Sequence, residues 1–337
     1  MKKRVIIAVS ALLVTVLLLG TLQLLVTPKY IDNPEGALIP EYYDEIGGHD
    51  LIFIGDCEVY ESFIPAVLFE KYGISSYVRG SAQQLVWQSY YLLEETLKYE
   101  TPKAVVFNVM ALKYGEPQRE AYNRMTLDGM KWSSSKIDSI NASMTDEESF
   151  IEYLFPILRY HSRITELSAD DIKYLLSSPK VSHSGYLMQT GVVPRTDFSE
   201  GREQLDYEIA QNAWSYLDKM REICDKNDIE LILVKAPTNS WQYYWHDEWE
   251  SQVDEYAQKY SLSYYNFIPL CDEIGIDWSQ DTYDAGAHLN VYGAEKLTLY
   301  FGNILSNSHG LTDKRDDLEL NGEWQQKIEL YYKERNE

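Results

Sequence analysis

The chain has 337 residues, of which 45% are hydrophobic and 25% charged, and these values are ordinary for a globular protein with a sizeable core. Acidic residues outnumber basic ones by 53 to 30, and a surface of that charge disfavours nucleic acids and anionic lipids as partners. Three cysteines are too few for a disulfide scaffold. The sequence shows no metal-ligand spacing and no phosphate-binding glycine loop, so we expect no metal and no cofactor.

The first 26 residues combine a basic flank with an apolar run. Residues 1–4 hold three basic side chains, and Val5–Val26 is a run of 22 residues without a charge. This run is long enough to cross a bilayer, and the basic flank should stay in the cytoplasm. We predict an uncleaved transmembrane signal anchor that places the rest of the chain on the extracytoplasmic side; a cleaved secretion signal is the alternative. Residues 30–337 carry 26 basic and 53 acidic side chains, a net charge of −27.

Strand-like and helix-like segments then alternate. Residues 27–47, with several prolines and glycines, are predicted to form a stem, and residues 48–308 an α/β domain. Strands are predicted at Leu51–Ile54, Ser75–Arg79, Ala104–Val109, Glu230–Lys235 and Ser263–Ile268. Helices are predicted at Pro65–Tyr72, Gln84–Tyr99, Leu205–Asp228, about 249–259, and Tyr292 to about Leu305. Mostly apolar strands that alternate with helices predict a parallel sheet covered by helices on both faces.

Two segments interrupt or follow this alternation. Residues 110–200 mix short helical patterns with serine-rich turns, and we interpret them as a helical insertion or lid at the carboxyl side of the sheet. Residues 309–337 are predicted to be a charged tail with one amphipathic helix. Cys224 has the spacing of a buried helix position, and Cys271 could pair with it, although the sequence does not decide this.

A candidate nucleophile and a candidate base stand far apart in the chain. Cys57 follows the first strand directly after a Gly55–Asp56 turn, where a strand–turn–helix lifts a side chain above the sheet edge. His288 lies in a glycine-containing loop with two nearby acids, Asp281 and Asp284. A histidine base needs a carboxylate that orients it. We therefore predict a catalytic group of Cys57, His288 and Asp284, with Asp281 as the alternative acid.

These residues resemble the sequence blocks of the SGNH/GDSL hydrolase superfamily. Gly55-Asp56-Cys57 is similar to the Gly-Asp-Ser block, and Asp284 and His288 are similar to the last block. Gly80 and Asn108 match the two positions that the family uses as oxyanion donors. The resemblance implies a three-layer flavodoxin-like fold and acyl-ester chemistry. Two departures are a cysteine at the nucleophile position and a third residue inserted between acid and histidine.

Together with the anchor, the resemblance implies a membrane-bound esterase or O-acyltransferase of the cell envelope. Its expected substrate is a cell-surface glycan or acylated sugar, and its possible partner a membrane acyl-donor protein. Trp241, Tyr244 and Trp245 follow a predicted strand and could stack on sugar rings, or simply pack a lid. The alternatives are an inactive protein of this fold that binds or assembles polysaccharide and, less in keeping with the order of the blocks, a cysteine peptidase.

Overall fold

The computed structural model describes the chain except for residues 1, 31–32, 178, 196–202, 241–244 and 337. Its centre is one sheet of five parallel strands in the order β2-β1-β3-β4-β5. The strands are β1 (Leu51–Gly55), β2 (Ser76–Gly80), β3 (Ala104–Asn108), β4 (Glu230–Lys235) and β5 (Ser263–Asn266). This order is that of the flavodoxin-like folds, and it confirms the predicted parallel α/β class.

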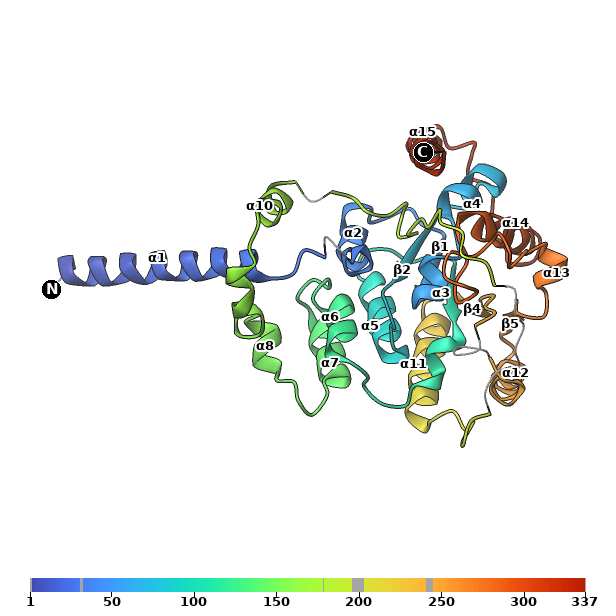
Figure 1. The fold of residues 1–337 in the computed structure, drawn as a ribbon, viewed down its shortest axis with the longest axis horizontal. Coiled ribbons are helices and arrows are strands. Elements are labelled where there is room, and N and C mark those ends of the chain that lie inside the picture. The colour runs from blue at the N-terminus through green and yellow to red at the C-terminus, as the bar shows by residue number, and fades with distance from the viewer. Residues whose placement is uncertain (1, 31–32, 178, 196–202, 241–244, 337) are drawn as a thin grey trace.

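Helices cover both faces of the sheet (Figure 1). On one face lie α4 (Pro65–Tyr72), α14 (Val291–Ser308) and α15 (Leu318–Arg335), and on the other α5 (Val86–Thr96), α11 (Gln211–Lys226) and α12 (Asp247–Tyr260). Side chains alternate along each strand: Phe53 packs with the first set of helices, and Ile52 and Ile54 pack with the second. All five residues of β1, β2 and β3 are buried, as a parallel sheet covered on both faces requires.

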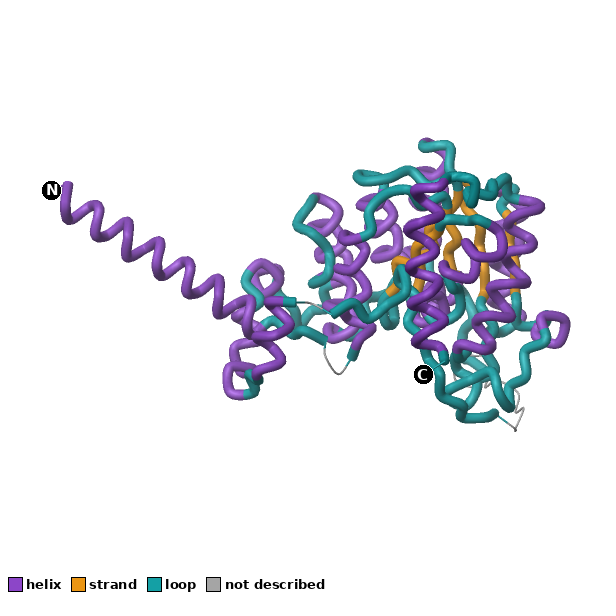
Figure 2. Tube along the Cα trace, turned by 90° about the horizontal axis from the view of Figure 1, so that it is seen from above, coloured by secondary structure: helices purple, strands orange, loops and turns teal. Residues whose placement is uncertain are grey.

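The remaining helices are short and mostly belong to the stem and the insertion. They are α2 (Leu38–Glu41), α3 (Cys57–Tyr60), α6 (Glu120–Leu127), α7 (Ser134–Ser143), α8 (Phe150–Leu154), α9 (Ile157–Tyr160), α10 (Ala169–Leu176) and α13 (Cys271–Ile274). The described residues also form 3-10 helices, namely η1 (Pro34–Ala37), η2 (Tyr42–Asp44), η3 (Val109–Lys113) and η4 (His161–Thr165). Figure 2 shows the strands between helices at the end of the molecule that lies away from the N-terminus.

The insertion divides into two parts with different neighbours. Its first residues and its last ones reach the carboxyl edge of the sheet, where Tyr122 and Gln189 help to line a cavity. Its middle packs elsewhere, with α7 against α5 and with α9, η4 and α10 against the end of α1 (Lys2–Val26). The middle of the insertion therefore joins the sheet domain to α1 instead of covering the strand ends.

Helix α1 projects away from the rest of the molecule (Figures 1 and 2). Its 25 residues have a mean hydropathy of 2.8 in their most apolar window, and that window is fully exposed. By length and composition this helix is able to cross a membrane, and a secretion signal near the N-terminus meets the same criteria. The three cysteines are unpaired, so the pairing of Cys224 with Cys271 that the sequence left open is not formed.

Candidate functional site

The end of β1 places Cys57 at the carboxyl edge of the sheet. Gly55 ends the strand, and Asp56 caps the next helix by accepting a hydrogen bond from the Glu58 backbone N–H. Cys57 is consequently the first residue of α3 and partly exposed. A side chain added at Gly55 would come within 2.5 Å of Val59, so the turn into α3 needs a glycine there.

Cys57, His288 and Asp284 form a hydrogen-bonded chain. The Sγ of Cys57 lies 2.9 Å from Nε2 of His288, and Nδ1 of the same ring lies 2.7 Å from Oδ2 of Asp284. The Asp284 carboxylate also accepts the backbone N–H of His288 at 2.9 Å. A carboxylate on Nδ1 fixes the tautomer that leaves Nε2 free to take the thiol proton. The structure brings the three residues together in the geometry of a nucleophile, a base and an orienting acid.

Asp281, the alternative acid, has different partners. Its Oδ2 accepts Lys296 Nζ at 2.5 Å and the Asp277 backbone N–H at 2.7 Å, and the side chain is buried. Of the two acids in the loop, the structure therefore places Asp284, and not Asp281, on His288. Asn290, which ends the loop, caps α14 by accepting from the N–H groups of Tyr292 and Gly293.

Burial and neighbouring charges shift the pKa of Cys57 in opposite directions, and the same holds for the pKa of His288. Burial raises the pKa of the Cys57 thiol, and this outweighs the lowering effect of His288 beside it. The pKa of His288 is held well above its usual value: burial opposes this, but the contacts with Cys57, Asp284 and Glu61 prevail. Burial therefore favours the thiol form of Cys57, and the acidic groups around His288 make its imidazole a stronger base for the thiol proton.

A second carboxylate lies next to His288. Glu61 follows Cys57 by one helical turn, and its Oε2 lies 3.7 Å from His288 Nδ1. Its Oε1 accepts the Tyr283 hydroxyl at 2.9 Å. Burial, first of all, raises the pKa of Glu61 to about 7, so its charge changes close to neutral pH. When charged, Glu61 adds to the negative potential that keeps His288 protonated after proton transfer.

A buried polar network lies beneath Cys57. Nζ of Lys235, at the end of β4, bonds both carboxylate oxygens of Glu58 at 2.7 and 2.9 Å. The amide Nδ2 of Asn108 donates to Glu58 at 2.9 Å and to Asp56 at 3.2 Å, while its Oδ1 accepts the Ala236 N–H. Burial and the nearby Glu58 raise the pKa of Asp56 to about 6. The network ties the ends of β1, β3 and β4 together below the candidate nucleophile.

This network does not support the predicted oxyanion role of Asn108. Both hydrogens of its amide are directed to the carboxylates of Asp56 and Glu58, and the side chain is fully buried. Gly80, the other predicted donor, is the last residue of β2 and pairs in register with Gly55. The cavity wall next to it is formed by Ala82 and Gln83 instead. The role of Gly80 as an oxyanion donor stays a prediction.

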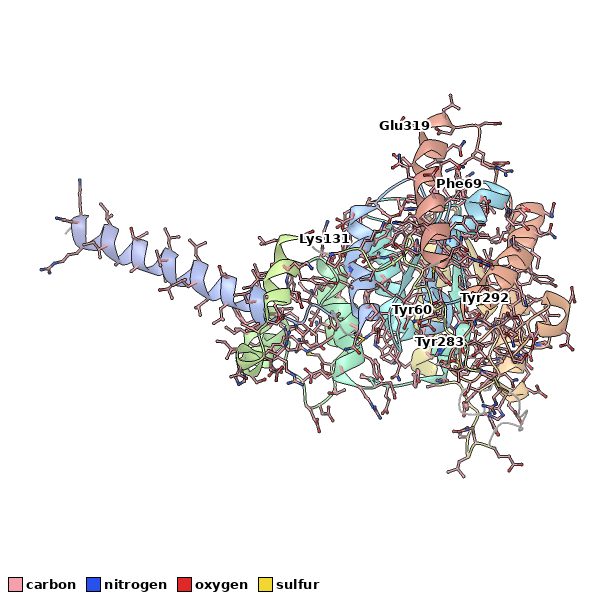
Figure 3. The ribbon with its side chains drawn as sticks, turned by 45° about the horizontal axis from the view of Figure 1, so that its top comes forward. Tyr60, Phe69, Lys131, Tyr283, Tyr292 and Glu319 are labelled. Atoms are coloured by element: carbon pink, nitrogen blue, oxygen red, sulfur yellow. The ribbon has the colours of Figure 1, made fainter. Side chains whose placement is uncertain are left out.

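The cavity at the sheet edge has a volume of about 360 Å³. Cys57 and His288 open into it, and four tyrosines contribute to its wall, namely Tyr60, Tyr114, Tyr122 and Tyr283. Figure 3 labels Tyr60 and Tyr283, which lie close together in the sheet domain and far from α1. Four carboxylates and Lys113 add polar groups to this wall: Glu35, Asp56, Glu58 and Glu61. The site is thus an aromatic and acidic pocket.

The predicted sugar-stacking residues have a mixed outcome. Trp241 and Tyr244 lie outside the described residues. Trp245 is only 2% exposed, lies with its ring 5.4 Å from that of Trp249, and belongs to the core cluster on one face of the sheet. For Trp245 the prediction of a sugar-stacking surface is wrong, because the ring packs the interior between β4 and α12. Packing was the alternative that the sequence had left open.

Sequence reasoning missed Glu61, Tyr283 and Lys235. Glu61 carried a local signal, because a residue four positions after Cys57 shares its helix face. Lys235 carried one as well, since a charge that closes an otherwise apolar strand marks the polar edge of a parallel sheet. Within the described residues, no group of three or more histidine, cysteine or acidic side chains could hold a metal ion.

Comparison with known proteins does not assign the chain to a family. No family model matches the sequence, and no curated protein matches it. Among solved structures, the chain is similar to a protein from Bacteroides fragilis named as a candidate acylhydrolase, with 12% identity and a TM-score of 0.36 over 83% of this chain and 99% of that one. A similarity of this size identifies neither the activity nor the family.

Proposed function

We propose that the protein is an SGNH-type esterase or O-acyltransferase that forms an acyl-enzyme on Cys57. One observation carries the proposal: a hydrogen-bonded chain runs from Asp284 through His288 to Cys57 and ends in a cavity. The order of these residues along the chain agrees with the resemblance to the SGNH superfamily. The nucleophile follows β1, and the acid and the base precede the last helix of the sheet domain. Such an arrangement supports acyl-ester chemistry, and that chemistry needs no cofactor.

The reaction proceeds in two balanced steps. Sγ of Cys57 attacks the acyl carbonyl while Nε2 of His288 takes the thiol proton, and the proton then passes to the departing alkoxide. A thioester on Cys57 and a free hydroxyl are the products. In the second step His288 takes a proton from water or from an acceptor hydroxyl, whose oxygen attacks the thioester and restores the thiol. Asp284 holds the imidazole throughout, and the Cys57 backbone N–H is a candidate donor to the oxyanion.

The cavity suits a neutral acylated sugar. Four tyrosines in its wall offer rings for the apolar faces of a pyranose and hydroxyls for its edges. Its carboxylates, Glu35 and Glu61 among them, disfavour an anionic substrate. With α1 as an anchor, we propose that the sheet domain acts on a cell-surface glycan on the extracytoplasmic side. A membrane protein that donates the acyl group is a possible partner.

Hydrolysis of p-nitrophenyl acetate tests the proposal. The full chain in detergent is compared with Cys57→Ala, Cys57→Ser and His288→Ala, and thermal unfolding checks that each variant is folded. Turnover that disappears in both alanine variants and persists in Cys57→Ser supports an acyl-enzyme of the SGNH type. Equal, buffer-like rates in four folded proteins contradict it.

An inactive glycan-binding protein is the second candidate, and the occupied amide of Asn108 favours it. The amide of Asn108 donates its hydrogen bonds to Asp56 and Glu58, so it is not available to stabilise an oxyanion in the cavity. Glycan binding measured by calorimetry on Cys57→Ala distinguishes the two, because a binding protein keeps its affinity without any turnover in the parent chain.

A further inference from the structure

An apolar surface flanks the end of α1. In the described part of the chain, eighteen large hydrophobic side chains outside α1 are exposed, and eight of these lie between residues 151 and 176. We call these eight the apolar collar: Ile151, Leu154, Phe155, Leu158, Ile164, Ile172, Leu175 and Leu176. Single exposed apolar residues are normal, whereas a group of this size marks a surface that binds something.

Helix α8 presents two of its apolar residues outward. Ile151 and Leu154, three positions apart, are exposed, as is Phe155, which directly follows the helix, while Phe150 at its start is partly buried. The intervening Tyr153 is buried, with the guanidinium of Arg124 4.0 Å above its ring. The helix is attached to the domain through Tyr153, so its apolar stripe has no partner among the described residues.

Helix α10 repeats this arrangement. Ile172, Leu175 and Leu176 have the i, i+3, i+4 spacing of one helix face and are 55%, 40% and 83% exposed. Asp171 is buried on the inner side and bonds Arg163 at 2.9 Å. An amphipathic helix on the surface of a soluble domain normally turns its apolar stripe to the core. Both α8 and α10 do the reverse.

The helices that carry the apolar collar are fixed to the end of α1. α9, η4 and α10 contact α1, and Figure 1 shows α8 and α10 on opposite sides of its last turn. Arg163 donates to the Val26 carbonyl at 2.8 Å as well as to Asp171, and so joins α1 to α10. Lys29 bonds the carbonyls of Leu24 and Thr27. Basic groups on the last carbonyls of a helix satisfy acceptors that the helix leaves free.

We propose that the apolar collar lies in the surface of the bilayer that α1 crosses, so that lipid is the partner of this face. The collar continues the apolar surface of α1, and its aliphatic and phenyl side chains suit the boundary between headgroups and acyl chains. Residues 151–176 carry three basic and four acidic side chains, so apolar insertion, and not attraction to anionic lipid, drives the contact.

This contact goes beyond the proposed function because it sets the distance of the cavity from the membrane. In Figure 3, Tyr60 and Tyr283 lie beyond the helices of the insertion as seen from α1. With the apolar collar on the bilayer, the insertion acts as a spacer that holds the cavity away from the lipid. A glycan, and not a membrane lipid, is then the substrate within reach.

Spin labelling of the full chain in phosphatidylcholine vesicles tests this proposal. Cys57 and Cys271, the two partly exposed thiols, are replaced by serine, and single cysteines are introduced by Leu176→Cys in α10 and Leu154→Cys in α8. The matched control is Leu318→Cys in α15, because Leu318 is 84% exposed and Leu176 83%. Each introduced cysteine carries a nitroxide spin label. The accessibility of the label is measured to oxygen, which concentrates in lipid, and to a water-soluble nickel chelate.

We expect the labels at positions 176 and 154 to be reached better by oxygen than by the nickel chelate, and the label at 318 to show the reverse order. Free access of the chelate to all three labels would overturn the proposal, as would lipid exposure of only one of the two helices. Spin–spin broadening at position 176 that disappears on dilution with unlabelled chain would assign the surface to a second copy, and would also overturn it.

Discussion

Breaking the ion pair beneath Cys57 should strongly destabilise the domain. Lys235→Met removes the counter-charge of Glu58, which is 4% exposed and lies next to a second buried acid, Asp56. Removing one partner of a buried pair typically costs about 3–5 kcal/mol, because the remaining charge is left without compensation. For a domain of this size each kcal/mol lowers the Tm by about 2–4 °C, so the expected loss is roughly 6–20 °C.

The double variant Lys235→Met/Glu58→Gln separates this cause from lost packing. Its neutral amide no longer needs a counter-charge and still offers an acceptor to Asn108, so we expect it to recover at least half of the lost stability. Lys103→Met is the matched control: Lys103 pairs with Asp50 at 3.2 Å, but its side chain is 46% exposed. An exposed pair of this kind should cost less than about 1 kcal/mol.

Intrinsic fluorescence records the thermal unfolding of the parent chain, Lys235→Met, the double variant and Lys103→Met in the same detergent. The reasoning would be refuted if Lys235→Met unfolded at the temperature of Lys103→Met, or if the double variant were as unstable as the single one.

Three further predictions concern the site. Asp284→Asn should lower kcat for p-nitrophenyl acetate by on the order of 10⁴-fold, because His288 loses the group that fixes its tautomer, whereas Asp281→Asn should mainly lower the Tm; equal kcat values would contradict this assignment. Burial raises the Cys57 pKa, so its alkylation by iodoacetamide should keep rising as the pH passes about 9, and a plateau below neutral pH would show a thiolate already formed. The folded pKa of Glu61, about 7, lies above its unfolded value, so its stabilising contribution is complete below the unfolded pKa and lost as the pH rises through 7. Glu61→Gln should therefore raise the Tm at about pH 8 and leave it unchanged at about pH 4, and an equal shift at both pH values would rule out the titration of Glu61 as the cause.

Much of the sheet could be predicted from the sequence, because β1, β3 and β4 are short, mostly apolar runs and all five strands alternate with helices. The parallel arrangement then follows, since strands joined by helices return to the same edge. Boundaries were less accurate: the helix expected from Leu205 begins at Gln211, and the strand expected to reach Ile268 ends at Asn266. The longer helix was predicted because Leu205 has the spacing of the apolar residues that follow it. In the structure Leu205 is fully exposed and does not pack against the core.

The candidate site was predictable where the signals are local. Cys57 stands in a turn after a strand, and His288 shares a loop with two acids. Between these acids the sequence favoured Asp284 and kept Asp281 as the alternative, because the geometry depends on the backbone between Asp284 and His288. Ala285 and Gly286 both adopt positive φ angles, 61° and 92°, and this tight turn brings the Asp284 carboxylate back to the His288 ring despite the extra residue.

The role of Asn108 could not be read from the sequence for a different reason. Its partners are Asp56, which follows β1, and Glu58 in α3, and they lie 52 and 50 residues away in the chain. Lys235, which completes the network, is separated from Glu58 by 177 residues. Pairing over such distances depends on the order of the strands. Once β1, β3 and β4 are neighbours, these polar groups at their ends must meet.

The central claim is that Cys57 carries the acyl group. Intact mass spectrometry of the full chain, quenched in acid during turnover of p-nitrophenyl acetate, tests this most directly, with Cys57→Ser and Cys57→Ala beside it. We expect one added acetyl group that maps to residue 57, is removed by neutral hydroxylamine in the parent chain, persists longer as an ester in Cys57→Ser, and is missing from Cys57→Ala. An unmodified Cys57 during measurable turnover, or an acetyl group on Cys57→Ala at the same level, would contradict the account.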